Sequence, residues 1–189
     1  MQIISWTDFI KGNHFKSPTS MTIGVFDGIH RGHKALLEKI KSSGFLPVVV
    51  TFSESPRKFF KGKNFINEII TLEEKLKIFE SEGIAAVILI DFSDDFSKTR
   101  GDEFLKTLIC KGNLHYLAVG YDFACGFNGK TKTAEVKRIA EECGVKTDVV
   151  QPVLEDGLPV SSSRIRSAIA SGDYQKASLL LGRSFSAPK

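Results

Sequence analysis

Short runs of apolar and β-branched residues alternate along the chain with segments in which apolar residues recur every three or four positions. The runs are typical of buried strands and the periodic segments of amphipathic helices. Strands are predicted over residues 21–26, 47–52, 85–90, 114–119 and 146–150. Helices are predicted over residues 31–43, 71–80, 101–110, 133–143 and 177–183. This alternation favours an α/β fold with a parallel sheet of about five strands, flanked by helices on both faces.

Turn and cap residues mark several helix ends. Gly44 is a C-terminal stop, Thr71 is an N-cap before an acidic first turn, and Thr99 is expected to cap the helix over residues 101–110. Loops are expected over residues 53–63, 91–96 and 120–129, each directly after a strand. Because open α/β sheets bind ligands at the carboxyl ends of their strands, these loops are expected to border a site.

Composition narrows the class of protein. The 189 residues fit one domain with a full core, and 42% hydrophobic and 25% charged residues are ordinary globular values. The net charge of +4 is explained by a small anionic ligand, so no nucleic-acid partner is expected. No apolar run approaches the roughly 20 residues of a membrane helix, so no membrane partner is expected. Three scattered cysteines suggest reduced thiols and a cytoplasmic location, and the oligomeric state is left open.

The most specific pattern is Gly-Val-Phe-Asp-Gly-Ile-His-Arg-Gly-His over residues 24–33, between the first strand and the first helix. Gly28 and Gly32 allow backbone conformations or close approaches that a side chain would block, and a helix N-terminus attracts anions. His30 and His33 come near one side of the helix start, where protonated or hydrogen-bonding rings bind phosphate oxygens. The pattern predicts a nucleotide phosphate cradle. The alternative is a plain turn with two surface histidines.

Other segments carry complementary groups. Ser-Ser-Ser-Arg-Ile-Arg over residues 161–166 places hydroxyl groups before a helix and guanidinium groups in its first turns, which suits phosphate oxygens, although a serine-capped surface helix has the same pattern. Residues 120–129 combine glycines, aromatic rings and Asp122, which suits adenine recognition or a turn. Phe52 and Arg57 suit a flavin ring and its phosphate, or a solvated basic loop. The acidic residues 91–96 suit magnesium or solvent.

Taken in their order along the chain, over residues 24–33, 51–56, 119–126 and 160–166, these motifs resemble those of bacterial FAD synthetases, a branch of the HxGH nucleotidyltransferase superfamily. The resemblance implies a Rossmann-like nucleotidyltransferase fold and transfer of AMP from ATP to FMN with Mg2+, giving FAD and pyrophosphate. It implies catalytic roles for His30, His33 and Arg166, and a metal-binding role for Asp122. The implied ATP-binding residues are Gly24, Phe26, Asp27, Gly28, Gly32, Asp122, Phe123, Gly126, Ser162 and Ser163. The implied flavin-binding residues are Phe52, Ser55, Pro56 and Arg57.

The residue at position 55 and the length of the chain both differ from those of the resembling enzymes, and each difference leaves alternatives open. Ser55 stands where the resembling enzymes usually have histidine, so a different phosphate monoester as acceptor is one alternative, and a non-catalytic flavin or nucleotide sensor is another. Residues 1–183 are expected to form the nucleotidyltransferase domain, and residues 184–189 a tail or a truncated linker, without a riboflavin kinase domain. Whether the chain stands alone or was cut from a bifunctional enzyme is left open.

Overall fold

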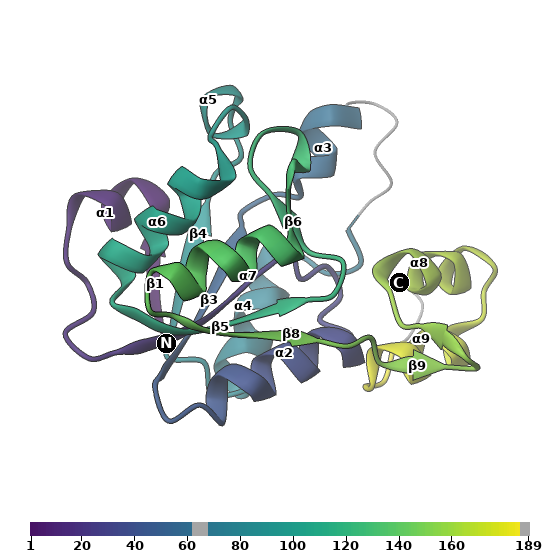
Figure 1. Cartoon of the computed structure of the whole chain (residues 1–189). Helices are drawn as coiled ribbons and strands as arrows, with labels where there is room; N and C mark the ends of the chain where they lie inside the picture. The colour runs from purple at the N-terminus through teal and green to yellow at the C-terminus, as the bar shows by residue number, and fades with distance from the viewer. Residues whose placement is uncertain (62–67, 186–189) are drawn as a thin grey trace.

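A computed structural model describes residues 1–61 and 68–185 of the chain. Six parallel strands form its main sheet, in the order β1-β4-β3-β2-β5-β8 (Figure 1). These strands are β1 (Gln2–Ser5), β2 (Thr19–Ile23), β3 (Leu46–Phe52), β4 (Ala86–Ile90), β5 (Leu114–Gly120) and β8 (Lys146–Val150). The predicted parallel α/β sheet is confirmed, and the expected number of about five strands misses β1. That strand has four residues, of which only Ile4 is buried, so it carries almost no hydrophobic signal.

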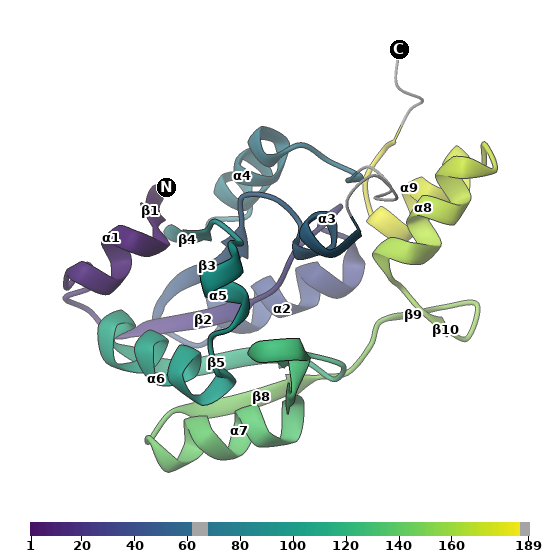
Figure 2. The same ribbon diagram turned by 90° about the horizontal axis from the view of Figure 1, so that it is seen from above.

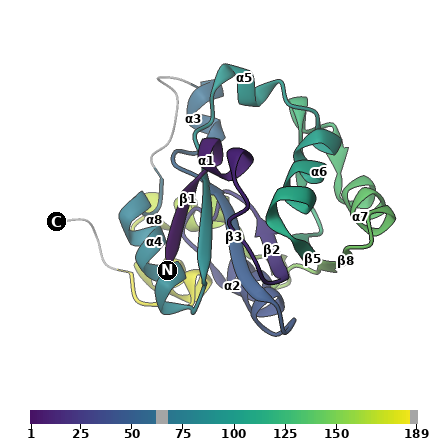
Figure 3. The same cartoon turned by 90° about the vertical axis from the view of Figure 1, so that its left-hand side faces the viewer.

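Helices cover both faces of the sheet (Figure 3). They are α1 (Trp6–Lys11), α2 (Arg31–Lys41), α3 (Pro56–Lys61), α4 (Leu72–Ser81), α5 (Asp94–Ser97), α6 (Gly101–Gly112), α7 (Thr133–Glu142), α8 (Ser162–Ala170) and α9 (Tyr174–Leu181). Alternate strand residues face opposite layers: Val48 and Val50 pack with α1, α6 and α7, whereas Val49 packs with α2 and α4. The described part of the chain contains no helix that is long and apolar enough to span a membrane.

A smaller apolar cluster lies beyond the carboxyl ends of the central strands. It joins α8 to α9 through Ile165, Ala168, Ala177 and Leu181 (Figure 2). The hairpin of β9 (Leu154–Glu155) and β10 (Leu158–Pro159) connects this pair of helices to the sheet. Helices α8 and α9 therefore lie opposite the carboxyl edge of the sheet (Figure 2).

Several element ends differ from the predicted ones. The strand predicted over residues 21–26 ends at Ile23, because Phe26 has a φ of 54° that no strand accepts. The loop expected over residues 53–63 contains α3, whose first turn is supported by a 3.3 Å hydrogen bond from the Arg57 amide to Ser55 Oγ. Positions 62 and 63 of that predicted loop lie outside the described residues.

Two predicted N-caps had different outcomes. Thr71 and Glu74 form a complete capping box at the start of α4, as the acidic first turn indicates. The prediction for Thr99 was wrong, because Arg100 is the N-cap residue of α6 and makes no side-chain cap hydrogen bond. The Thr99 carbonyl instead accepts a 2.8 Å hydrogen bond from the Phe127 amide, in a second hairpin formed by β6 (Ala124–Cys125) and β7 (Thr131–Lys132). A tertiary contact therefore determines the backbone at this helix start.

Candidate functional site

A cleft of about 820 Å³ lies at the carboxyl edge of the sheet. The last residues of four strands line it: Ile23, Phe52, Gly120 and Val150. The strand order changes direction between β2 and β5, because β3 follows β2 on one side and β5 lies on the other. Ligands of open α/β sheets bind at such a switch point.

The cleft brings together sixteen of the seventeen residues for which sequence patterns predict a site role. Lining it are Gly24, Phe26, Asp27, His30, Gly32, His33, Phe52, Ser55, Pro56, Arg57, Asp122, Phe123, Gly126, Ser162, Ser163 and Arg166. Gly28 is absent from the lining. It has a φ of +85°, and an added Cβ would lie 3.1 Å from Ile69 Cδ1. Gly28 therefore packs against Ile69 on the side of the turn away from the cleft, and its predicted contact with ATP stays a prediction.

The turn after β2 is held in an uncommon backbone conformation. Phe26 and Ile29 have φ values of 54° and 39°, although both carry bulky side chains and both are fully buried. Positive φ costs such residues about 1–2 kcal/mol each, so the surrounding structure must hold them there. The Thr51 hydroxyl donates to the Val25 carbonyl at 3.2 Å, and Arg183 donates to the Ile29 carbonyl at 3.1 Å.

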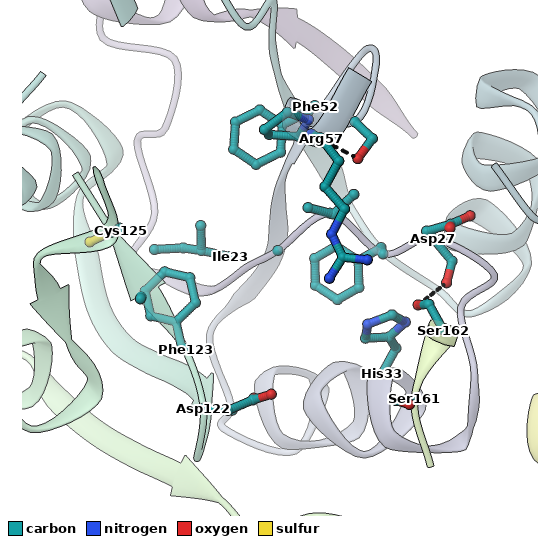
Figure 4. A pocket seen from close by; sticks show the side chains of 18 of the residues that line it. Ile23, Asp27, His33, Phe52, Arg57, Asp122, Phe123, Cys125, Ser161 and Ser162 are labelled. Atoms are coloured by element: carbon teal, nitrogen blue, oxygen red, sulfur yellow. Dashed lines mark hydrogen bonds between the residues drawn. The ribbon is translucent and has the colours of Figure 1, made fainter. Parts of the chain in front are cut away.

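Asp27 connects this turn to two distant segments. Its Oδ1 accepts a 2.7 Å hydrogen bond from the Ile69 amide, and its Oδ2 forms an ion pair with Arg166 of α8. The Ser162 hydroxyl donates to the Asp27 carbonyl at 2.8 Å, as drawn in Figure 4. The side chains of Asp27 and Arg166 are 8% and 17% exposed, so water screens their attraction only weakly. The two phosphate-binding motifs predicted from sequence are thus physically joined.

His30 and His33 stack directly on each other at the start of α2. Their ring centroids are 3.6 Å apart, and His30 Nδ1 caps the helix by accepting from the His33 amide at 3.3 Å. A Cβ on Gly32 would lie 3.1 Å from His30 Cε1, so this glycine permits the stack. The Nδ1 atom of His33 is buried and has no hydrogen-bond partner among the described residues.

Burial decides the protonation state of both rings. It lowers the pKa of His30 to about 4, with a further contribution from the charge of Arg183. Burial, followed by the nearby His30 and Lys75, places the pKa of His33 well below its usual range. Of the two forms expected from sequence, the neutral hydrogen-bonding ring is therefore the one present at neutral pH. A bound polyphosphate would favour the protonated form, because its negative charge lies close to the rings.

The two arginines of residues 161–166 have different positions. Ser161 caps α8 by accepting from the Arg164 amide, and the Arg164 guanidinium donates to the carbonyls of Leu158 and Glu155. Arg164 therefore supports the β9–β10 hairpin, whereas Arg166 lines the cleft. Ser161 and Ser162 lie close to His33 in Figure 4. Of these two arginines, Arg166 is therefore the one that can contact a ligand in the cleft.

The loop over residues 120–129, which is predicted to recognise adenine, is held by Thr133 and by the close approach of Gly126 to Gly101. The Thr133 hydroxyl lies 2.9 Å from the Phe123 carbonyl and 3.1 Å from the Tyr121 carbonyl. Gly126 has a φ of +74°, and a Cβ there would lie 2.3 Å from the Gly101 amide nitrogen. This close approach fixes the loop on the start of α6. It leaves the exposed Asp122 carboxylate and the Phe123 ring at the cleft.

Aromatic side chains dominate the opposite side of the cleft. Phe92 makes edge contacts with Phe52, Phe59 and Phe60, with ring centroids 5.9, 5.4 and 5.6 Å apart. We name these four residues the phenylalanine ledge; Phe52, Phe60 and Phe92 line the cleft, and Phe59 contacts Phe60 and Phe92 outside the lining. Phe59 and Phe60 are 48% and 65% exposed, which is unusual for rings of this size. In Figure 4, Arg57 extends from α3 into the cleft toward His33.

Sequence patterns missed two features of the site. Phe92 lies in the acidic segment after β4, which was expected to face a ligand through its carboxylates rather than its rings. Lys75 is buried under the cleft at 1% exposure. It occupies a position on the apolar face of α4, three residues after Leu72 and four before Phe79, and a lysine in such a position is a signal of a buried charge.

Two of the three carboxylates of the acidic segment, those of Asp91 and Asp94, have partners outside the cleft. Asp91 accepts from the Ser53 hydroxyl, and Asp94 pairs with Lys98. In residues 1–61 and 68–185, no three histidine, cysteine or acidic side chains gather as a metal site. All three cysteines are free thiols, as predicted.

The chain is similar in sequence to known proteins. A family model described as FAD synthetase matches residues 12–164. The bifunctional riboflavin kinase/FMN adenylyltransferase of Buchnera aphidicola subsp. Schizaphis graminum is 30% identical over an alignment of 187 positions, which covers 94% of this chain and 60% of that protein. The Escherichia coli K12 protein of the same name is 32% identical over 87% of this chain and 54% of its own length. The chain thus spans about 60% or less of the length of these relatives.

Solved structures support the fold. A crystal structure described as a macrolide-efflux protein from Streptococcus pneumoniae superposes with a TM-score of 0.84 at 28% identity, covering 97% of this chain and 60% of that one. Pantoate-beta-alanine ligase from Francisella tularensis has a TM-score of 0.57 at 14% identity, covering 96% and 85%. The second likeness concerns the fold alone, and it confirms the predicted α/β architecture with a parallel sheet.

Proposed function

Because the chain belongs to the FAD synthetase family, we propose that it transfers AMP from ATP to the phosphate of FMN, giving FAD and pyrophosphate. The observation that supports this most is the cleft itself. One side carries a turn, two histidines and Arg166 suited to phosphates, and the other carries an exposed phenylalanine ledge suited to a large flat ring. Its volume of about 820 Å³ lies at the upper end of ordinary ligand sites and suits two substrates.

The reaction asks the protein for alignment and charge stabilisation. A phosphate oxygen of FMN forms a new bond to the α-phosphorus of ATP, while the bond to the bridging oxygen breaks and its electron pair leaves with pyrophosphate. His30, His33 and Arg166 bind the phosphate oxygens as negative charge develops on them, and Ser162 and Ser163 add hydroxyl donors. Binding of the triphosphate competes with Asp27 for Arg166.

The nucleotide is recognised beside β5. Phe123 offers a ring face to adenine, while Gly24, Gly32 and Gly126 keep the backbone close to the ligand. A magnesium ion fits the donor set here, because Mg2+ in nucleotide sites is held mainly by phosphates and by one or two carboxylates. The exposed carboxylate of Asp122 is the residue that would hold it. The ion would neutralise phosphate charge.

The acceptor lies between the ledge and the cradle. Arg57 supplies a positive charge for the FMN phosphate, and Pro56 and Phe52 border the ring. Ser55 is buried, where it supports the first turn of α3 and donates its amide to Glu68 at 2.7 Å. The absence of histidine at this position is therefore compatible with FMN, since Arg57 lies nearby.

We assign the nucleotidyltransferase activity to residues 1–183; positions 186–189 of the predicted tail lie outside the described residues. A cytoplasmic location fits the three free thiols and the use of ATP. ATP and FMN are the small-molecule partners in this proposal.

Chromatography of purified protein incubated with ATP, FMN and Mg2+ tests the proposal. FAD and pyrophosphate should appear in equal amounts, and His33→Ala should abolish most of both. His115→Ala is the matched control, because His115 is an exposed histidine on β5 and does not line the cleft. Pyrophosphate release with another phosphate monoester but not with FMN, or binding of both substrates without any pyrophosphate, contradicts the proposal.

A further inference from the structure

Lys75 is a buried cation that the proposed reaction does not use. It lies on α4, its side chain is 1% exposed, and its Nζ donates a 3.4 Å hydrogen bond to the Phe52 carbonyl. Burial lowers the pKa of Lys75, while the charges of Glu68 and Asp27 act in the opposite direction and favour the protonated form. A methionine would fill the same volume without the cost of desolvating an ammonium group. The charge itself therefore requires an explanation.

The groups around Lys75 belong to both sides of the cleft. Phe52 ends β3 and begins the acceptor side. Glu68 Oε1 accepts from the Ser55 amide at 2.7 Å, which fixes the segment before α3. Asp27, in the phosphate-binding turn, accepts from the Ile69 amide at the same distance.

Glu68 and Ile69 are consecutive, so this short segment bridges the two sides of the cleft. Each end of the bridge is a hydrogen bond from an amide to a carboxylate, and a charged carboxylate is a stronger acceptor than a neutral group. Asp27 is buried and Glu68 is partly buried, so water screens their attraction to a nearby cation only weakly. The charge of Lys75 attracts both carboxylates, whereas Arg166 forms an ion pair with Asp27.

We propose that Lys75 is a positioning residue, whose buried charge fixes the acceptor side of the cleft relative to the phosphate-binding turn. The inference rests on the proposed adenylyl transfer. Displacing an acceptor by about 1 Å from its nucleophilic position can cost on the order of 100-fold in rate without weakening nucleotide binding. Lys75 therefore acts on turnover and on the acceptor, and leaves ATP binding unchanged.

Three variants test this inference. Lys75→Met keeps the length and removes the charge, Lys75→Arg keeps the charge, and Lys77→Met is the matched control. Lys77 lies on the same helix with a side chain that is 71% exposed and pairs with Glu73. We expect Lys75→Met to lower kcat by roughly 10- to 100-fold and to raise KM for FMN, with an unchanged Kd for ATP. Lys75→Arg should restore most of the rate, and Lys77→Met should match the wild type.

Hydrogen exchange gives a readout that does not depend on activity. The Ser55 and Ile69 amides should exchange faster in Lys75→Met than in the wild type, and at the wild-type rate in Lys77→Met. If Lys75→Met does not fold, Glu68→Gln replaces it, because Gln keeps an acceptor oxygen and removes the charge. In that variant the Ser55 amide alone should exchange faster.

Wild-type exchange at both amides in Lys75→Met, or at Ser55 in Glu68→Gln, overturns the inference. So does a loss of kcat in Lys75→Met that is accompanied by an equal loss of ATP binding. Absence of FAD formation by the wild-type protein would overturn the proposed function instead, and the exchange rates would still decide the role of Lys75.

Discussion

The two sides of the cleft are built differently. The phosphate-binding turn is buried and strained, and four separate segments hold it through Thr51, Ile69, Ser162 and Arg183. The acceptor side consists of the six-residue helix α3 and a phenylalanine ledge whose outer residues, Phe59 and Phe60, are 48% and 65% exposed. The difference shows where rigidity is required. Charge stabilisation depends on groups that are in place before the reaction, whereas a flat ring is bound by surface that it covers itself.

Alanine substitutions on the two sides should separate turnover from acceptor binding. His33→Ala is expected to lower kcat for FAD formation by about 10²–10³-fold, because it removes a group that binds developing phosphate charge. Arg57→Ala should mainly raise KM for FMN. Steady-state kinetics with each substrate varied in turn checks both. The contrast between the sides fails if Arg57→Ala lowers kcat as much as His33→Ala does.

Acid should destabilise the protein through the histidine stack. The folded-state pKa of His30 is about 4 and the unfolded value is near 6.5, so the unfolded chain binds a proton that the folded protein rejects between these values. The free energy of unfolding should therefore fall by about 2 kcal/mol as pH decreases from 7 to 5, with His33 adding to the loss. Urea denaturation at both pH values measures this.

His30→Asn is the control for the acid effect. Asparagine keeps a side-chain acceptor at the N-cap of α2 and removes the titrating group. This variant should lose less free energy of unfolding between pH 7 and pH 5 than the wild type. An equal loss in both proteins would contradict the assigned cause.

Crowding at Gly28 should show how tightly the turn is held. Gly28→Ala is expected to cost about 2 kcal/mol of stability, because alanine disfavours a φ of +85° and its Cβ would meet Ile69 and Leu181. Gly83→Ala is the matched control, since Gly83 has a φ of +79° and no atom lies within 4 Å of an added Cβ. It should cost about 1 kcal/mol. Equal losses in thermal denaturation would show that the turn is not crowded.

The smallest effect on stability is expected at the ledge. Phe60→Ala should change the free energy of unfolding by less than about 0.5 kcal/mol, because the ring is 65% exposed. The same variant should raise KM for FMN several-fold and leave the Kd for ATP unchanged. A large loss of stability would place Phe60 in the core of the protein, and an unchanged KM would exclude the ledge from the acceptor site.

Local sequence patterns predicted most of the fold, and they predicted which loops lie at the edge of the sheet that forms the cleft. Apolar runs and helical periodicity located five of the six strands of the main sheet and the principal helices, and loops at the carboxyl ends of parallel strands necessarily meet at one edge. The elements β1, α1, α3 and α5 were missed, and α5 begins inside the loop expected over residues 91–96; each has only four to six residues, too few to show a period. Thr99 resembled a cap, but a tertiary contact of its carbonyl determines the backbone there.

Properties that depend on burial could not be predicted in this way. The neutral state of His30 and His33 results from desolvation and from charges on distant segments. Residue type alone does not distinguish Arg164 from Arg166; the structure separates them, because Arg164 donates to the β9–β10 hairpin and Arg166 pairs with Asp27 at the cleft. Lys75 has ordinary helix-forming chemistry, and its importance arises from partners in three other segments.

Calorimetric titration of ATP and Mg2+ into the protein without any acceptor tests most directly whether the phosphate side is formed in advance. Because the turn is held by the protein alone, ATP should bind in the absence of FMN. An ATP analogue with a methylene group between the α- and β-phosphorus atoms cannot react, and its Kd should change little when FMN is added. His33→Ala should weaken this binding, and Phe60→Ala should not. A wild-type protein that binds ATP only after FMN is present would contradict the account.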